Sequence, residues 1–247
     1  MYNFFASEKS LDNKYFITGN DHNHIRNVLR MKIGDTFLIS DNGISNRCRI
    51  IAFSDDVTTA EILEENYQST ELSVELHLFQ GLPKSDKLEL IIQKTVELGV
   101  CSITPVEMSR SITKIEEKKK ANKITRWQAI SESAAKQSKR NIIPRINNIM
   151  NYRQAIDFAS ELDLILLPYE AKNGMADTKA ALDLIKPGMR IGIFIGPEGG
   201  FDDKEIAAAL ESGAKIISLG KRILRTETAA ISSVAMCMLH CELTFES

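Results

Sequence analysis

Two continuous apolar runs near the carboxyl end of the chain, each followed by a glycine-bearing turn, constrain the fold most strongly. Residues 189–195 read MRIGIFI, and residues 214–219 read AKIISL. Runs of this length without polar alternation are typical of strands buried on both faces, as in a parallel sheet. The turns IGPEGGF (195–201) and LGKRILRTETA (219–229) would then lie at the carboxyl ends of consecutive strands. Open α/β sheets bind ligands there, so the two turns predict one shared pocket.

Strand-like and helical patterns alternate from Leu72 onward, which predicts a parallel α/β domain. Asp202 and Glu205 have the spacing of a capping box, so a helix is expected to begin directly after the first turn. The expected strands are 74–82, 102–108, 162–168, 189–195 and 215–219, and the expected helices are 88–98, 121–138, 152–159, 204–211 and 228–242.

The first seventy residues show a different pattern, with short runs of alternating apolar and polar residues separated by turns. An Asn42-Gly43 turn between apolar runs favours an antiparallel hairpin, and residues 22–31 favour a short helix. The expected strands are 15–18, 36–40, 47–53 and 58–63. This pattern predicts a small β-barrel over residues 1–70, a polar linker near 67–70, and an α/β domain over residues 71–247.

The overall amino-acid composition neither indicates nor excludes a nucleic-acid partner. The 247 residues carry a net charge of −2, with a pI of about 6.1. Residues 84–145 nevertheless hold 14 Lys and Arg against 7 Asp and Glu. Such a basic segment could face phosphates, although lysine runs such as 118–120 also occur on ordinary solvated helix faces.

The four cysteines show no C-x-x-C pairing, and we expect them to be core thiols. No histidine pair has zinc spacing with them, so we predict no metal. Neither a signal peptide nor a long apolar segment is recognised, which predicts a cytoplasmic protein without a membrane partner.

The two turns together resemble those of the SPOUT methyltransferases, specifically the family that methylates N3 of a uridine in small-subunit (16S) ribosomal RNA. Other stretches agree with this family in order and nearly end to end: HIRNVLR (24–30) with Gly34-Asp35, KTVELGV (94–100), Pro105, Arg110-Ser111, Arg126-Trp127, and ESAAKQSKR (132–140) with Pro144. The resemblance implies a small PUA-like RNA-binding β-barrel, followed by a SPOUT α/β domain with a parallel sheet and a carboxyl-terminal trefoil knot.

The resemblance also implies S-adenosylmethionine as the methyl donor, and the residues are compatible with it. Backbone groups in the two turns could bond an adenine edge, while Ile223 and Leu224 could cover its faces. Glu170 could meet a ribose hydroxyl or the donor's ammonium group, or it could be a solvated loop acid. The expected cofactor-binding residues are Leu167, Pro168, Glu170, Gly196, Pro197, Glu198, Gly199, Gly200, Leu219, Gly220, Arg222, Ile223 and Leu224.

Transfer of a methyl group to uridine N3 needs in-line positioning and loss of the N3 proton, so electrostatics and positioning should dominate. We expect Arg225 to stabilise the charge that develops on the uracil ring. Glu227 would accept the proton or orient Arg225, although a first-turn helix carboxylate is also favoured by the helix dipole alone. Glu198 is the alternative acid.

Arginine suits phosphate because its planar fork is bidentate and always charged. The expected RNA-binding residues are Arg26, Arg30, Arg110, Arg126, Gln137, Arg140 and Arg145. Trp127 could stack on a base, but packing is favoured.

The last helix is apolar nearly all round, so it needs cover on more than one side. A homodimer would supply that cover; helix 121–138 of the same chain is the alternative. Two other functions compete with the uridine-N3 reaction. One is a methyltransferase of the same fold acting on another RNA nucleotide, and the other is a non-catalytic RNA-binding assembly factor.

Overall fold

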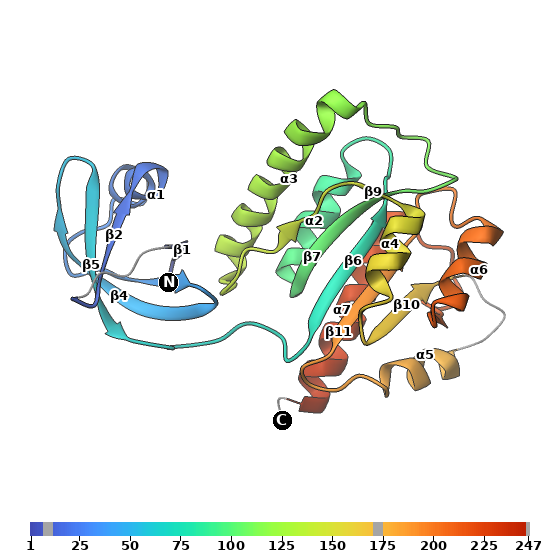
Figure 1. The fold of residues 1–247 in the computed structure, drawn as a ribbon. Helices are drawn as coiled ribbons and strands as arrows, with labels where there is room; N and C mark the ends of the chain where they lie inside the picture. Colours follow the sequence, from blue (N-terminus) through green and yellow to red (C-terminus); the bar gives the residue numbers. More distant parts are fainter. Residues whose placement is uncertain (7–11, 170–174, 246–247) are drawn as a thin grey trace. The chain divides into compact units, whose positions relative to one another are not determined.

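The computed structural model of the chain describes residues 1–6, 12–169 and 175–245. By its contacts the chain divides into two compact units, coloured along the sequence in Figure 1. The first contains Met1–Glu71 and Ala135–Ile143, and the second contains Leu72–Ala134 and Pro144–Ser247. No feature of the sequence had assigned Ala135–Ile143 to the first unit.

The first unit is a curled five-stranded sheet with the strand order β1-β3-β4-β5-β2. Its elements are β1 (Asn3–Phe5), β2 (Lys14–Thr18), α1 (Gly19–Asn23), the single π-helical turn η1 (His24–Val28), β3 (Thr36–Asp41), β4 (Ile44–Phe53) and β5 (Val57–Glu64). The expected hairpin at Asn42-Gly43 is present, because β3 and β4 pair antiparallel through Asp41 and Ile44. β1 was missed because three residues are too short to show a period, and it pairs parallel with β3.

The second unit is built on a parallel seven-stranded sheet with the order β12-β10-β11-β6-β7-β8, and β9 pairs with β7. Its strands are β6 (Glu75–Gly81), β7 (Val100–Glu107), β8 (Arg145–Ile146), β9 (Met150–Asn151), β10 (Leu164–Pro168), β11 (Arg190–Ile195) and β12 (Lys215–Ile217). Its helices are α2 (Lys87–Glu97), α4 (Tyr152–Ala159), α5 (Met175–Leu182), α6 (Asp203–Glu211) and α7 (Thr226–Phe245). Helix α3 (Glu117–Ser138) begins in this unit. The parallel sheet predicted from the apolar runs is therefore confirmed.

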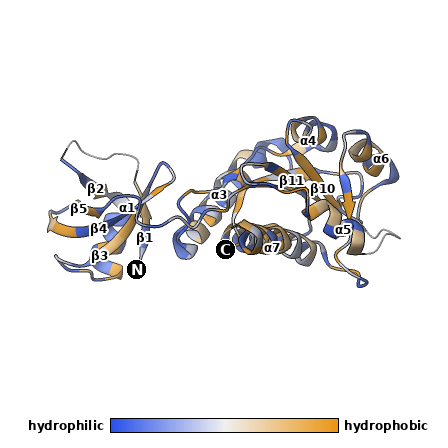
Figure 2. Ribbon diagram, turned by 90° about the horizontal axis from the view of Figure 1, so that it is seen from below, coloured by the Kyte–Doolittle hydropathy of each residue, from blue (hydrophilic) through white to orange (hydrophobic). Residues whose placement is uncertain are grey.

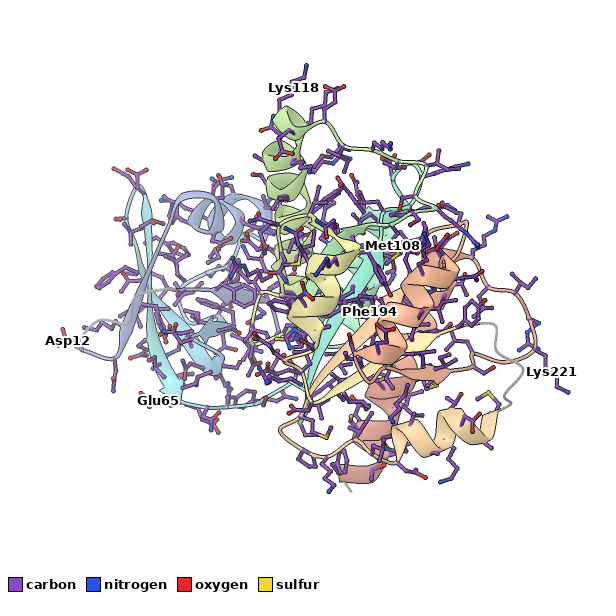
Figure 3. The ribbon with its side chains drawn as sticks, turned by 45° about the vertical axis from the view of Figure 1, so that its right-hand side comes forward. Asp12, Glu65, Met108, Lys118, Phe194 and Lys221 are labelled. Carbon is purple, nitrogen blue, oxygen red and sulfur yellow. The ribbon has the colours of Figure 1, made fainter. Side chains whose placement is uncertain are left out.

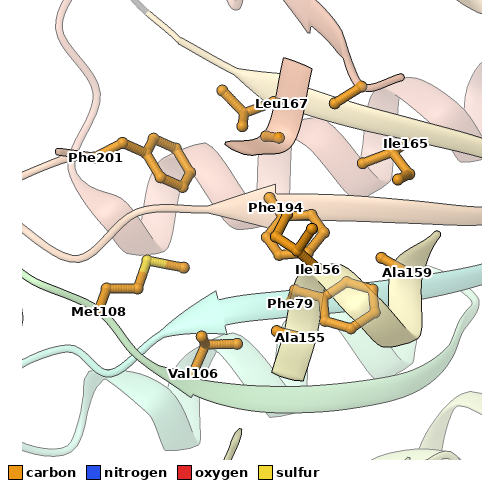
Figure 4. Packing of buried hydrophobic residues seen from close by; sticks show 12 residues of the cluster. Phe79, Val106, Met108, Ala155, Ile156, Ala159, Ile165, Leu167, Phe194 and Phe201 are labelled. Atoms are coloured by element: carbon orange, nitrogen blue, oxygen red, sulfur yellow. The ribbon is translucent and has the colours of Figure 1, made fainter. Parts of the chain in front are cut away.

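Helices cover both faces of the parallel sheet, with α4 and α6 on one face and α7 on the other (Figure 2). The core under α4 contains Phe79 and Phe194 from the central strands β6 and β11, whose rings stack 4.4 Å apart (Figure 4). Phe201 and Met108, from the segments that follow β11 and β7, extend this cluster. The central strands are thus held rigidly up to the points where their loops begin.

Helix α7 differs from two expectations. By length and composition alone it could span a membrane, with a mean hydropathy of 1.3, whereas no long apolar segment was recognised in the sequence. Here it packs against β11, β6 and α2, with Val234 and Cys237 fully buried. Its main helical neighbour is α2, whereas the sequence had offered helix 121–138 for this cover.

Candidate functional site

A pocket of about 640 Å³ lies at the carboxyl ends of β10, β11 and β12. Three segments line it: Pro168 and Tyr169 at the end of β10, Ile195–Phe201 from the last residue of β11 onward, and most of Ser218–Thr226, which ends with the first residue of α7. Lys87 and Arg110 complete the wall from two further segments, and Ala229 adds to it from α7. The two glycine-bearing turns therefore do build one pocket, at the edge of the sheet that the sequence predicts.

The turn after β11 leaves no room for side chains where other segments approach it. A Cβ atom on Gly199 would lie 2.9 Å from the Cβ atom of Arg110 and 3.2 Å from its carbonyl oxygen. Arg110 in turn donates a hydrogen bond from Nη1 to the Gly199 carbonyl over 3.2 Å. Gly200 has a φ of +68°, a conformation that L side chains rarely adopt. The turn is thus defined by its glycines and locked to the segment that carries Arg110.

Helix α6 begins directly after this turn and fixes its far end. The predicted capping box is confirmed: Asp202 accepts the Lys204 N–H, and Glu205 accepts the Asp202 N–H. The second carboxylate oxygen of Glu205, a buried side chain, accepts the Ser109 N–H over 2.8 Å. One side chain therefore caps α6 and also anchors the residue next to Arg110.

The turn after β12 is held at both of its ends. Near its start, Thr178 of α5 exchanges hydrogen bonds with the backbone of Ser218. At its end, the Thr226 hydroxyl donates to the Gly196 carbonyl over 2.7 Å and so ties the two turns together. Between these anchors Ile223 is 84% exposed although it lines the pocket, and Lys221 lies at the outer tip of the loop (Figure 3).

Three charged side chains from separate elements meet beside the pocket. The Lys87 ammonium lies 2.9 Å from Glu198 Oε1 and 3.3 Å from Glu227 Oε2. Glu198 also accepts the backbone N–H of Lys84 over 3.1 Å. The Glu227 oxygen is buried and forms no hydrogen bond of good geometry with the residues that the structure describes, so its contact with Lys87 is an ion pair.

This arrangement shifts the pKa values of two of the three groups. Partial burial works to raise the pKa of Glu198, but hydrogen bonds from Lys87 and from backbone N–H groups outweigh it and lower that pKa. The hydrogen bond to Glu198 raises the pKa of Lys87 against the opposing effect of partial burial, and Glu227 adds to the increase. Lys87 and Glu198 are therefore charged over a wide range of pH.

Most of the expected cofactor-binding residues lie in the pocket wall. Those that line it are Pro168, Gly196, Pro197, Glu198, Gly199, Gly200, Leu219, Gly220, Arg222, Ile223 and Leu224. Leu167 does not, because its side chain is 1% exposed and belongs to the core. Glu170 lies outside the described residues. Of the expected catalytic residues, Arg225 and Glu198 line the pocket, while Glu227 lies behind Lys87.

The sequence did not single out Lys87, Tyr169 or Ser218. Tyr169 directly follows the predicted strand 162–168, and Ser218 lies near the end of the predicted strand 215–219, so a position at the carboxyl end of a strand is the signal that could have identified these two residues. Lys87 follows β6, the strand between β11 and β7. The loop after that strand carries no glycine-rich turn, so nothing drew attention to it.

The expected RNA-binding residues are distributed over both units. Arg26, Arg30 and Gln137 are exposed in the first unit, and Arg126 and Arg145 are exposed in the second. The Arg126 guanidinium already donates a hydrogen bond to Glu89 of α2, so part of its donor capacity is used within the chain. Arg110 stands in the pocket wall instead of on a remote face.

Arg140 requires a correction. Its side chain is 3% exposed, and its Nε donates to Glu71 Oε1 over 2.9 Å. The same Glu71 carboxylate accepts the Asn141 N–H, so this ion pair fastens Ala135–Ile143 to the rest of the first unit. A guanidinium committed and buried in this way is not presented to a phosphate, and its role is structural.

The pocket fits a flat, polar ligand with apolar parts. Its volume lies within the range of about 300–1,000 Å³ that is typical of small-molecule sites. The exposed Ile223 offers an apolar surface, and the glycine turn offers backbone groups at close range. Among the described residues, the wall contains four cations (Lys87, Arg110, Arg222 and Arg225) and one acid, Glu198. The described residues contain no cluster of three His, Cys, Asp or Glu side chains that could hold a metal.

Comparison with known proteins gives the same assignment for both parts of the chain. Residues 70–238 match the family model of an RNA methyltransferase domain, and residues 17–56 match that of an RNA methyltransferase PUA domain. The chain is 34% identical to ribosomal RNA small subunit methyltransferase E of Bacillus subtilis, over 93% of this chain and 91% of that protein. It is 35% identical to the protein of the same name from Mesomycoplasma hyopneumoniae, over 96% and 99% of the two chains.

Solved structures agree with these sequence matches. A ribosomal RNA small subunit methyltransferase E from Neisseria gonorrhoeae, bound to S-adenosyl methionine, superposes with a TM-score of 0.83 and 32% identity, over 97% of each chain. A putative methyltransferase from Legionella pneumophila, in complex with the same cofactor, superposes with a TM-score of 0.81 and 27% identity, over 96% and 97% of the two chains. The two turns, the pocket that they enclose and these matches over nearly the whole length lead to one conclusion: the chain belongs to the ribosomal RNA small subunit methyltransferase E family.

Proposed function

We propose that this chain methylates N3 of a specific uridine in small-subunit ribosomal RNA, with S-adenosylmethionine as the methyl donor. The observation that carries the proposal is the pocket between the Ile195–Phe201 and Ser218–Thr226 loops, in a chain of this family. When bound, the donor supplies a methyl group on a positively charged sulfur. The chain has to hold it, orient the base and stabilise the charge on the uracil ring.

The donor would lie against the two turns. Gly196–Gly200 and Leu219–Leu224 offer backbone groups to its polar edge, and Ile223 offers apolar cover. The tie between Thr226 and the Gly196 carbonyl supports this placement, because it fixes the spacing of the two turns before any ligand arrives. We place no weight on Leu167, whose side chain is buried in the core.

Arg225 is the residue that we assign to the developing charge on the base. It is exposed at the pocket wall, one residue before α7, and its guanidinium is always charged. Glu227 and Glu198 are two acids of the described site that could accept the N3 proton or hold a neighbouring cation.

RNA would be captured by Arg26, Arg30 and Gln137 of the first unit, and by Arg110, Arg126 and Arg145 of the second. Exposure of all six side chains supports the proposal, and Arg110 would act at the pocket itself. We further propose that residues 1–70 form the RNA-binding domain and residues 71–247 the methyltransferase domain, acting in the cytoplasm.

A homodimer is proposed from the surface of α7. Its Leu239 and Leu243 are 50% and 78% exposed, although α2, β11 and β6 cover the opposite side of the helix. A second copy would bury these leucines through a two-fold contact. Sedimentation tests this directly, because a 27.6 kDa species at micromolar concentration contradicts it.

The carboxyl-terminal trefoil knot is proposed from the resemblance. The chain order supports it: after the edge strand β12 the chain returns through α7 to pack on the central strands β11 and β6. A crystal structure traced through the whole chain would test it.

The proposed function is tested by mass mapping of small-subunit RNA from cells that lack this chain, before and after addition of the purified protein and donor. We expect one uridine to gain one methyl group at N3. Arg225→Ala should lower that rate at least about ten-fold, equivalent to roughly 1.4 kcal/mol. Lys221→Ala is the control, because it removes a cation from the same loop outside the pocket wall.

If the experiment finds the methyl group on another nucleotide, the assignments of the fold and of the methyl donor stand, and only the assignment of the substrate changes. RNA binding without any methylation would favour a non-catalytic assembly factor.

A further inference from the structure

In the described part of the pocket wall, Lys87 is the cation that contacts two carboxylates. It stands in the first turn of α2, Glu198 belongs to the turn after β11, and Glu227 belongs to the first turn of α7. The side chains are only partly exposed: 29% for Lys87, 28% for Glu198 and 15% for Glu227. A side chain held from two sides has a defined position, unlike a lysine on an open surface.

The contacts with Glu198 and Glu227 do not use all the hydrogen-bond donors of Lys87. An ammonium group has three donors and no acceptor. One points to Glu198 at 2.9 Å, and a second group, Glu227, approaches within 3.3 Å. Because Lys87 also lines the pocket, a third donor is available to an acceptor atom of a ligand. The raised pKa keeps the group protonated, so Lys87 acts as a donor and not as a base.

The two carboxylates are better suited to hold Lys87 than to accept a proton. Glu198 receives the Lys87 ammonium and the Lys84 N–H, and its lowered pKa makes it a weak base. Glu227 is absent from the pocket wall, and one of its oxygens is buried against Lys87.

Resting on the proposed function, we propose that the Lys87 ammonium donates a hydrogen bond to a carbonyl oxygen beside N3 of the target uracil, with Glu198 and Glu227 as positioning residues. Uracil has a carbonyl on each side of N3. Cytosine carries an amino group in place of one of them and has no proton on N3. A fixed donor to the C4 carbonyl oxygen would select uracil over cytosine, which carries its amino group at that carbon. A donor to either oxygen would stabilise the N3-deprotonated form of uracil, in which negative charge spreads onto both oxygens.

The step balances without a protein base. The N3–H bond breaks and the proton passes to hydroxide from the solvent, forming water. The electron pair left on N3 forms the new bond to the methyl carbon while the carbon–sulfur bond of the donor breaks, and its electrons remain on sulfur as a neutral thioether. Lys87 keeps its own proton throughout and lowers the energy of the uracil anion.

Lys87→Met tests this assignment, with Lys94→Met as the matched control. Lys94 lies on the same helix and pairs with Glu97, outside the pocket. At neutral pH we expect Lys87→Met to lower the methylation rate roughly 100-fold, the size of effect seen when one donor to a developing oxyanion is lost. Lys94→Met should match the wild type. Lys87→Arg should recover part of the loss, because it restores a charged donor.

Two further readouts separate this role from a structural one. The loss in Lys87→Met should shrink as the pH rises, since hydroxide then generates the uracil anion without help; a folding defect would give a constant loss. Donor affinity, measured by calorimetry, should stay unchanged. Weaker donor binding in Lys87→Met would show that Lys87 holds the donor's carboxylate instead, and it would overturn the proposal.

Substrates in which sulfur replaces one carbonyl oxygen locate the contact. Sulfur is a poor hydrogen-bond acceptor, so one of the two thio-substituted RNAs should lose rate with the wild type and not with Lys87→Met. Equal effects on both proteins would overturn the assignment. So would a Glu227→Gln or Glu198→Gln variant that is slower than Lys87→Met, because a lost general base would explain that result.

A wild-type chain that methylates no uridine would overturn the proposed function, and this assignment with it. An active wild type together with an equally active Lys87→Met variant would overturn this assignment alone.

Discussion

Gln80 donates a hydrogen bond from Nε2 to the hydroxyl of Thr226 over 2.9 Å, although 146 positions separate the two residues. Gln80 is fully buried near the end of β6, and Thr226 is the first residue of α7. Since Thr226 in turn donates to the Gly196 carbonyl, three elements around the pocket share one hydroxyl group. The start of α7 is therefore fixed relative to the first turn by a polar contact inside the core.

Thr226→Val keeps the shape of the side chain and removes the hydroxyl. It leaves the Gly196 carbonyl and the Gln80 amide without this partner, so we expect the free energy of unfolding to fall by about 1–3 kcal/mol. Urea denaturation measures this loss. Thr226→Ser retains the hydroxyl and should be the more stable of the two; equal stabilities would show that the shared hydroxyl contributes nothing.

Gly199→Ala should abolish donor binding. The added methyl group would lie 2.9 Å from the Arg110 Cβ atom, so either the turn or the Arg110 segment has to move. The wild type should gain about 2.7 kcal/mol of stability with donor at 100 times its dissociation constant, and the variant should gain none.

Gly213→Ala is the control for strain alone. Gly213 has a φ of +84° with open space around it, so alanine there should cost about 1 kcal/mol of stability and leave the donor's stabilisation intact. A full donor response in Gly199→Ala would place the donor elsewhere.

Arg30→Glu should weaken RNA binding and reduce the slope of log affinity against log salt by about one, because one phosphate contact is lost. Arg30 is exposed, so the substitution should not disturb the fold. Fluorescence titrations over a range of salt concentrations measure the slope. Arg49→Gln is the control, since that guanidinium already bonds Glu61. An unaltered slope in Arg30→Glu would remove Arg30 from the RNA-binding surface.

Arg140→Met should act on stability instead of on RNA affinity. In the wild type, the Arg140 side chain and the Asn141 N–H both donate hydrogen bonds to the Glu71 carboxylate. The substitution removes the charged partner of that carboxylate. Breaking one side of a buried ion pair typically costs about 3–5 kcal/mol, which thermal or urea unfolding will show. The double variant with Glu71→Gln should lose less than the two single variants added together. A stable Arg140→Met protein with a changed salt slope would restore Arg140 to the RNA surface.

The cysteines should differ in reactivity. Burial raises the pKa of Cys48 and of Cys237 to about 12 each, so almost no thiolate exists at about pH 8, and only the thiolate is nucleophilic. Cys101 is half-buried. Alkylation of the native protein, followed by mass spectrometry, should therefore modify Cys101 first. Modification of Cys237 at the same rate would mean that α7 opens readily from the sheet.

The parts of the fold that the sequence predicts are those with strong local signals. Long apolar runs gave β6, β7, β10 and β11, and the Asp202/Glu205 spacing gave the cap of α6. The short strands β1, β8 and β9 carry too few residues to show a period, and α5 lacks the one-sided apolar pattern that α4 of equal length has. The pairing of these strands depends on partners far away along the chain, which no local pattern reveals.

The site divides in the same way. The glycine turns could be predicted because a backbone that needs a positive φ or a close approach requires glycine at that position, and glycine is visible in the sequence. Lys87 could not, since its importance comes from Glu198 and Glu227, more than 100 positions away. The wrong assignment of Arg140 to the RNA surface has the same origin. The sequence alone does not distinguish an arginine that pairs with a carboxylate from one that contacts phosphate, and the partner Glu71 is identified only in the structure.

Ile223 stands 84% exposed at the mouth of the pocket, and this has a thermodynamic consequence. An apolar side chain held in water orders its surroundings, and covering it releases that hydration, so the heat capacity of the system falls on binding. The enthalpy of donor binding should therefore become more negative as the temperature rises, and Ile223→Ser should flatten that dependence. Hydration of one side chain would then contribute to how steeply the enthalpy of donor binding changes with temperature.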